Sequence, residues 1–168
     1  MGLCHRNLSL DAVALNGTHA AIGQLDWCMR FTSSITSSDQ EALPIPGGIN
    51  PVFMAPECFR RSSCPWDGFT ADLWAAGLML YTMVVGSEAL FAAPIIEDKL
   101  FVALCIEGKI RETVNAYVEA AEPEKALSDN LIELLERMLK ADPKQRYSLD
   151  EVINHQWVKC DDWKSPEI

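Results

Sequence analysis

The chain has 168 residues, 49% of them hydrophobic, so it is long enough to fold as one domain around a core of its own. Its 24 acidic residues outnumber its 14 lysines and arginines and give a net charge of −10, which argues against a nucleic acid or an anionic membrane as partner. The longest apolar run, residues 73–85, is too short to span a bilayer, and no pattern typical of a secretory signal is present.

The cysteines show neither a C-x-x-C pair nor the spacing of a metal site. Cys58 and Cys64 are close enough in sequence to form a disulfide in an oxidising compartment. We expect instead reduced, partly buried thiols in an intracellular, cytoplasmic protein. The six cysteines are Cys4, Cys28, Cys58, Cys64, Cys105 and Cys160.

Two short strands are predicted near the start of the chain, over residues 11–15 and 20–25. Asn16-Gly17 between them is a strong signal for a tight turn. From residue 32 to 50 the chain is polar and irregular, with the stretches TSSITSSDQE and PIPGG. We expect a surface loop there.

The rest of the chain is predicted to be helical. Residues 72–85 are apolar on every side, which is typical of a helix buried all round, and Gly86 ends it. Ser128 caps a further helix, and Ser148 with Glu151 forms a capping box at the start of another. The apolar face of the Ser128 helix comprises Leu131, Ile132, Leu134, Leu135, Met138 and Leu139. The predicted fold is mainly α, a helical bundle with a short β-hairpin near the N-terminus.

Four motifs, in this order, resemble the C-terminal lobe of a eukaryotic-type protein kinase. Residues 4–8, CHRNL, resemble the H-R-D-L catalytic loop, and residues 53–57, FMAPE, resemble the A-P-E motif that closes the activation segment. Residues 72–77, DLWAAG, resemble D-x-W-S-x-G, the start of the central helix of that lobe. Residues 142–146, DPKQR, and 155–157, HQW, resemble its last two helices. Motifs that keep one register over about 155 residues are a specific signal.

The resemblance implies a protein-kinase-like C-terminal lobe over residues 1–160, with a tail over 161–168. Within the lobe, residues 1–31 hold the catalytic loop and hairpin, 32–57 the activation segment, and 70–160 the helical subdomain. The similarity is greatest to serine/threonine kinases of the calmodulin-dependent type. In the family a glycine-rich phosphate loop, a strand lysine and a partner glutamate lie on an N-terminal lobe, and we find none of them in this sequence. The cofactors of the family are ATP and magnesium, and none is expected for this chain.

The polar residues of the catalytic-loop motif are exchanged. In the family the loop aspartate accepts the proton of the substrate hydroxyl, and here that position is Asn7, whose amide cannot take a proton near neutral pH. Ser9 stands where serine/threonine kinases have a lysine against the transferring phosphate, and Ala12 stands at the metal-binding asparagine. Asp11 is one residue away and, on a strand, points to the opposite side. The resemblance therefore predicts a chain without phosphoryl-transfer activity.

The metal-binding D-F-G triplet of the family has two alignments in this chain. The strand pattern places Gln24 at its aspartate. A shift by two residues places Asp26 there, in the stretch DWC, which keeps an acid and an aromatic residue but loses the glycine. The continuation MRF at residues 29–31 favours Asp26 slightly. Even so, one carboxylate without its asparagine partner is a poor magnesium site, and we expect no bound metal.

Other motif positions have structural roles in the family. His5 is expected to be a buried packing residue, and Arg6 pairs in the family with a phosphate on the activation segment. Asp72 is expected to hold the amides of the catalytic loop, with a simple helix cap as the alternative. Glu57 and Arg146 are expected to form a buried ion pair. Candidate phosphorylation sites, unless the loop stays unmodified, are Thr32, Ser33, Ser34, Thr36, Ser37 and Ser38.

Two classes of function fit these observations. The first is a pseudokinase-like binding or scaffold module that keeps the fold without transferring phosphate. The second is the C-terminal part of a divergent, active ATP-dependent serine/threonine protein kinase. An apolar face that the N-terminal lobe covers in the family is expected to bind a protein partner, unless Ile35, Leu43 and Ile45 of the 32–50 loop cover it. That face comprises Leu8, Val13, Leu15, Leu25 and Trp27.

Overall fold

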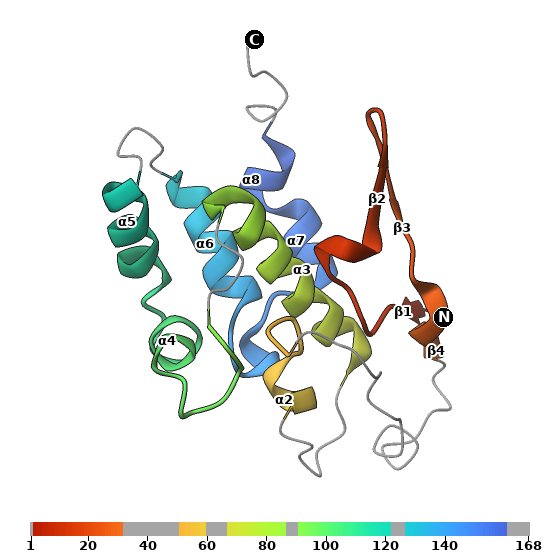
Figure 1. Cartoon of the computed structure of the whole chain (residues 1–168), viewed down its shortest axis with the longest axis horizontal. Helices are drawn as coiled ribbons and strands as arrows, with labels where there is room; N and C mark the ends of the chain where they lie inside the picture. The colour runs from red at the N-terminus through yellow and green to blue at the C-terminus, as the bar shows by residue number, and fades with distance from the viewer. Residues whose placement is uncertain (1, 32–50, 60–66, 87–90, 122–126, 161–168) are drawn as a thin grey trace.

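A computed structural model describes five stretches of the chain, which are residues 2–31, 51–59, 67–86, 91–121 and 127–160. Most of these residues are helical, and two small antiparallel sheets of two strands each lie near the N-terminus (Figure 1). The helices pack around α3 (Gly68–Val85), and the hairpin of the second sheet projects from one side of them. The predicted class, mainly α with a short hairpin, is confirmed.

The sheets are formed by two pairs of strands. They are β1 (Gly2–Cys4) with β4 (Met29–Phe31), and β2 (Val13–Asn16) with β3 (His19–Ile22). The sequence does not predict the β1–β4 pair, because strands of three residues are too short to show an alternating pattern.

The β2–β3 hairpin lies where the sequence predicts it, but its strands are shorter. β2 begins only at Val13, because Leu10–Ala12 form a 3-10 turn, η1. β3 ends before Gln24, which has the left-handed conformation with φ +55°, and a second 3-10 turn, η2 (Leu25–Trp27), follows. Gly17 in the connecting turn has φ +60°, a conformation that glycine adopts at no steric cost.

The helical segments follow in chain order. They are α2 (Pro56–Phe59), α3 (Gly68–Val85), α4 (Lys99–Phe101), the π-turn η3 (Val102–Ile106), α5 (Ile110–Ala121), α6 (Asp129–Met138), the 3-10 turn η4 (Pro143–Gln145), α7 (Leu149–Asn154) and α8 (Gln156–Lys159). The capping box of Ser148 and Glu151 is present at the start of α7, and the Ser128 side chain caps α6, as predicted.

Helix α3 begins four residues earlier than predicted. Asp67 is its N-cap, and the Asp67 carboxylate accepts a hydrogen bond from the amide of Phe69 at 3.0 Å. Gly86 ends the helix as predicted, with φ +72° and its amide donating to the carbonyl of Thr82. With 18 residues, α3 is long and apolar enough to cross a membrane by length and composition alone, unlike the shorter run that the sequence suggests. The core helix of a globular protein has the same two properties, and α3 packs against α6.

Helices α3 and α6 supply much of the core. Seven of the 18 residues of α3 are buried, more than in any other described helix, whereas α6 buries five of its ten residues and so has the larger buried share. The expectation that residues 72–85 are buried all round is wrong, because Met83 is 61% exposed.

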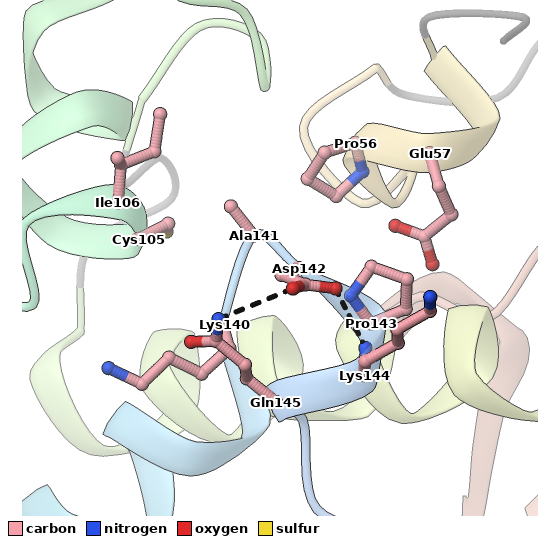
Figure 2. A pocket seen from close by; sticks show the side chains of 10 residues that line it. All are labelled: Pro56, Glu57, Cys105, Ile106, Lys140, Ala141, Asp142, Pro143, Lys144 and Gln145. Carbon is pink, nitrogen blue, oxygen red and sulfur yellow. Dashed lines mark hydrogen bonds between the residues drawn. The ribbon is translucent and has the colours of Figure 1, made fainter.

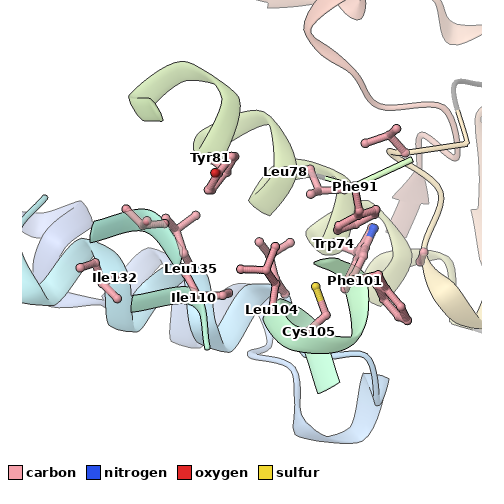
Figure 3. Close-up of a cluster of buried hydrophobic side chains, with 14 of the residues drawn as sticks. Trp74, Leu78, Tyr81, Phe91, Phe101, Leu104, Cys105, Ile110, Ile132 and Leu135 are labelled. Carbon is pink, nitrogen blue, oxygen red and sulfur yellow. The ribbon is translucent and has the colours of Figure 1, made fainter. Parts of the chain in front are cut away.

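Three aromatic rings form the centre of the core (Figure 3). Trp74 of α3, Phe91 and Phe101 of α4 have ring centroids 5.4 to 6.3 Å apart, in tilted and edge-on arrangements. Leu78 of α3 and Leu104 of η3 are almost fully buried beside them. This core joins α3 to the segment that leads into α5.

Five of the six cysteines lie in the described part of the chain, and no two of these five form a disulfide with each other. Cys64, the candidate partner of Cys58, lies outside the described residues. Burial raises the pKa of Cys4 and of Cys58 to about 12, so both thiols are protonated near neutral pH.

Candidate functional site

The loop between β1 and η1, which carries the catalytic-loop motif, is anchored by Asp72 of α3. The Asp72 carboxylate accepts hydrogen bonds from the backbone amides of His5 at 2.6 Å and of Arg6 at 2.8 Å. Because Asp67 caps α3, Asp72 is not the helix cap. Burial raises the pKa of Asp72 above its usual value of 3.8, although the two amide hydrogen bonds act in the opposite direction.

The backbone of the loop is strained at one residue. Arg6 has φ +67°, a left-handed conformation that disfavours a residue with a side chain by about 1–2 kcal/mol. The hydrogen bond from its amide to Asp72 holds this conformation. The shape of the loop therefore depends on a residue of the central helix.

His5 is buried and links the loop to the end of β3. Its Nε2 lies 2.8 Å from the carbonyl oxygen of Gly23, and its Nδ1 accepts a hydrogen bond from the amide of Asn7 at 3.3 Å. A carbonyl can only accept, so Nε2 carries the proton and the imidazole is the neutral tautomer. This is the packing position that the resemblance implies for His5.

The three exchanged catalytic-loop positions lie together in this loop and in η1. Asn7 and Ser9 are half-buried, whereas Ala12 is only 2% exposed. The amide of Ala12 donates to the carbonyl of Ser9 at 3.0 Å, and the carbonyl of Ala12 accepts from the amide of Gly23 at 2.8 Å. Ala12 thus presents only a buried methyl group at the position that the sequence aligns with a metal ligand. Within the described stretches, no three His, Cys, Asp or Glu side chains are grouped so that they could hold a metal ion.

The two candidates for the D-F-G aspartate differ in their contacts. The side-chain amide of Gln24 donates to the carbonyl of Asp11 at 3.1 Å, which brings it next to Ala12. Asp26 lies in the exposed turn η2, and its carboxylate makes no hydrogen bond to another described residue. Gln24, rather than the slightly favoured Asp26, is therefore the candidate that hydrogen-bonds to η1.

Glu57 and Arg146 form the ion pair expected from the sequence. The guanidinium binds both oxygens of the carboxylate, with Nη1–Oε1 at 2.8 Å and Nη2–Oε2 at 3.0 Å. The side chain of Arg146 is 0% exposed and that of Glu57 is 11% exposed. The pair joins α2 to the segment after α6 across 89 residues of sequence.

Other predicted positions cannot be placed, and two contacts were missed. The six candidate phosphorylation sites and the 32–50 loop lie outside the described residues. Sequence reasoning overlooked Asp67, although an aspartate directly before a glycine and a long apolar run is a recognisable cap signal. It also missed the Gln24–Asp11 contact, which has no local signal because the two residues meet only through the hairpin fold.

Comparisons with known proteins agree with the motifs. The family model described as protein kinase domain matches residues 37–158. Calcium-dependent protein kinase 14 of Oryza sativa subsp. japonica is 30% identical over 170 residues, which cover 99% of this chain and 28% of that protein. Serine/threonine-protein kinase SRK2E of Arabidopsis thaliana is 31% identical over 161 residues, covering 94% of this chain and 40% of that protein.

Calcium-dependent protein kinase 34 of Arabidopsis thaliana is 31% identical over 116 residues, or 69% of this chain and 19% of that protein. The chain thus spans well under half the length of each of these relatives. The family match covers the A-P-E motif, the central helix and the Glu57–Arg146 pair described above. This chain belongs to the protein kinase domain family.

Proposed function

We propose that this chain is the C-terminal lobe of a pseudokinase-like protein, which binds another protein and does not transfer phosphate. The observation that carries the proposal is the pair of residues at two catalytic positions, Asn7 and Ala12. The match to the family model begins at residue 37, beyond the catalytic loop and the hairpin. That boundary is in keeping with a loop that departs from the pattern of the family.

The first argument concerns the proton. The substrate hydroxyl must lose a proton as it attacks phosphate, and the resemblance assigns the acceptor to position 7. The Asn7 amide can hydrogen-bond a hydroxyl but stays neutral near pH 7. Loss of a general base typically lowers the rate about 10²- to 10⁴-fold.

The second argument concerns magnesium, which bridges the ATP phosphates in the family. Magnesium requires oxygen ligands in a near-octahedral arrangement. Ala12 offers a buried methyl group, and its carbonyl already accepts from Gly23. We assign Gln24 to the position of the D-F-G aspartate because its side chain hydrogen-bonds to η1, next to Ala12, and its amide carries no negative charge. These residues do not fit a magnesium ion.

The third argument concerns the hairpin face, defined as Leu8, Val13, Leu15, Leu25 and Trp27. Leu15 is 76% exposed and Leu25 is 57% exposed, and the other three residues are half-buried. Ile22 lies directly opposite Val13 in the hairpin and is also exposed, so it extends the same apolar surface. Apolar surface of this kind usually marks an interface, and a protein partner is its simplest occupant.

Phosphoryl transfer tests the catalytic part of the proposal. The purified 168-residue chain is incubated with γ-labelled ATP, magnesium and generic serine/threonine peptide substrates. We expect no transfer above that of a blank purification, and Asn7→Asp alone should not restore it, because Ser9 and Ala12 stay exchanged. Transfer that survives repeated purification, and that Asn7→Ala lowers as it would not lower a contaminant's activity, would overturn the assignment.

The alternative function is the C-terminal part of an active serine/threonine kinase. One observation favours it, since the Asp72 anchor and the Glu57–Arg146 pair are both intact, as an active family member would need them. The relatives are also longer than this chain. Transcript sequence upstream of the codon for Met1 separates the two proposals. A G-x-G-x-x-G stretch followed by a strand lysine would support the active kinase.

A further inference from the structure

A cavity of about 530 Å³ opens between α2, the end of η3 and the segment around η4, well away in sequence from the catalytic loop (Figure 2). We name it the α2–η4 cavity. It shares no residue with the hairpin face. Its lining residues are Pro56, Glu57, Cys105, Ile106, Lys140, Ala141, Asp142, Pro143, Lys144 and Gln145.

The walls of the α2–η4 cavity are fastened to one another by hydrogen bonds. The ion pair of Glu57 with Arg146 joins the α2 wall to the η4 wall. Arg146 also donates to the carbonyl of Lys140 from Nε at 3.1 Å and from Nη2 at 3.0 Å. The amide of Ala141 donates to the carbonyl of Cys105 at 3.1 Å, which joins the η4 wall to η3. A ligand would therefore meet a site that is already formed, which lowers the entropy lost on binding.

The acidic side chains at the cavity have hydrogen-bond partners, whereas its lysines form no ion pair with a described residue. Both carboxylates have donors, since Glu57 binds Arg146, and Asp142 accepts from the amide of Lys144 at 3.0 Å and from the side chain of Gln145 at 3.3 Å. Lys140 and Lys144 form no ion pair with any described residue. Figure 2 shows the two lysines on either side of Asp142. The uncommitted charges are thus two ammonium groups, in a chain of net charge −10.

The remaining lining is apolar and partly open to solvent. Among these lining residues Pro56 is buried, Ala141 and Pro143 are half-buried, and Ile106 is exposed. An apolar side chain fits against these groups, and carboxylates fit the two lysines. A ligand that matches both features is an acidic peptide with an apolar residue between its acidic residues.

We propose that the α2–η4 cavity docks a short acidic segment of a partner protein. An apolar side chain of that segment enters between Pro56, Ile106 and Pro143, and flanking carboxylates pair with Lys140 and Lys144. The site is independent of the hairpin face, so it stands whether or not the proposed binding function of that face is right.

The probe is a fluorescein-labelled peptide with a central leucine flanked by glutamates, titrated with the full 168-residue chain and followed by anisotropy. We expect saturable binding that weakens with added salt, and no binding of the counterpart peptide with lysines in place of glutamates. The double variant K140E/K144E should bind the acidic peptide at least about tenfold more weakly, because two attractive contacts become repulsive. Ile106→Ser should weaken it severalfold through loss of apolar contact.

Two matched controls separate docking from general effects. K99E/K159E makes the same change of charge at exposed lysines that do not line the cavity, and Ile96→Ser removes another exposed isoleucine. Both should bind the acidic peptide like the unchanged chain, and circular dichroism melts should be alike for all variants. Absence of binding by the unchanged chain, or equal loss in K140E/K144E and K99E/K159E, would overturn the proposal.

Discussion

Arg146 illustrates how one buried charge is satisfied in this fold. Its Nη1 donates to Glu57 and to the carbonyl of Thr70, and its Nε and Nη2 donate to the carbonyl of Lys140. The guanidinium lies over the ring of Trp74, 5.1 Å from the ring centroid. A cation without water around it needs such a set of acceptors, because each unpaired donor would lose its hydration without replacement. The residue therefore ties three segments to the aromatic core.

Removing either partner of this pair should destabilise the chain strongly. Arg146→Met leaves the Glu57 carboxylate unpaired, and Glu57→Gln leaves part of the guanidinium unpaired, so we expect each to lower the free energy of unfolding by roughly 3–5 kcal/mol. Urea denaturation of each variant and of the unchanged chain measures this difference in the free energy of unfolding. Arg111→Met, which breaks an exposed pair with Asp129, is the control and should change stability by less than about 1 kcal/mol. Equal effects of Arg146→Met and Arg111→Met would contradict the buried role.

The sequence predicts those helix ends that depend on a few neighbouring residues. The capping box of Ser148 and Glu151 and the stop at Gly86 are visible because each depends on one or two residues with a direct backbone partner. The sequence places the start of α3 too late, because Asp72 is also a residue type that commonly caps helices. Its true partners, the amides of residues 5 and 6, are more than sixty residues away in sequence.

The candidate site was less predictable than the helices for the same reason. The motif positions of Asn7, Ser9 and Ala12 follow from the spacing alone. The contact that distinguishes Gln24 from Asp26 depends on how the hairpin returns to the loop, and no local pattern encodes it. The three-residue strand β1 contacts α3, which also holds the loop that follows β1 through Asp72.

The approach of α3 to α6 requires a glycine. A Cβ at Gly77 would lie 3.0 Å from the Cβ of Met138 and 3.0 Å from a methyl group of Leu139. Gly77→Leu should therefore overpack this contact and lower the free energy of unfolding by about 1–3 kcal/mol or more. Ala76→Leu, at the next position but half-buried on another side of α3, is the control and should be better tolerated. If the melting temperature of the Gly77→Leu chain equals or exceeds that of the Ala76→Leu chain, α3 and α6 can move apart without a large loss of stability.

Glu133 of α6 links that helix to the segments after it and should make stability depend on acidity. It accepts from His155 Nε2 at 2.5 Å, from Tyr147 Oη at 2.9 Å and from Arg137 Nε at 3.2 Å. Burial alone would raise the pKa of Glu133. The hydrogen bonds outweigh burial, so the pKa of Glu133 lies below its usual value of 4.5. Between the lowered pKa and about pH 4.5, the unfolded chain therefore binds more protons than the folded chain. The stabilisation is complete above about pH 4.5 and is lost as the pH falls through the lowered pKa.

Glu133→Gln isolates this effect. We expect the difference in urea midpoint between the unchanged chain and Glu133→Gln to be constant at neutral pH and to shrink as the pH falls below about 4.5. Glu136→Gln, on the same helix, should show no such convergence. A difference that stays constant down to about pH 3 would mean that the Glu133 hydrogen bonds do not favour its charged form.

At the scale of the whole molecule, packing is uneven. The helices enclose an aromatic and aliphatic core, whereas the β2–β3 hairpin stands away from them (Figure 1). Each described sheet has two strands, so β2 and β3 each present one edge without a strand partner. An isolated two-stranded hairpin is at best marginally stable in water, and its exposed edges and leucines favour association. The chain should therefore be less stable at this end than at the helical end.

Replacement of the exposed apolar residues of this region should test that expectation. We predict that the unchanged chain binds an environment-sensitive apolar dye and self-associates in sedimentation. L15S/I22S/L25S should reduce both without lowering the melting temperature, because these side chains contribute little to the core.

The control is I96S/L149S/I153S, which changes three exposed apolar residues outside the hairpin. It should leave most of the dye signal intact. An unchanged chain that is a dye-silent, sharply melting monomer would show that the hairpin face is covered, and the proposed partner site would then be abandoned.

The Glu57–Arg146 pair also sets an order of events during protein synthesis. Glu57 is translated 89 residues before its partner, which at a typical rate of 5–20 residues per second is a delay of roughly 5–20 s. During that interval α2 has its carboxylate but no guanidinium, and α3 and α6 emerge and can pack first. Docking of α2 through this pair is therefore possible only after η4 has left the ribosome. A nascent chain stalled with α6 outside the ribosome and Arg146 still inside it should remain open to proteases at α2 while its aromatic core is already closed.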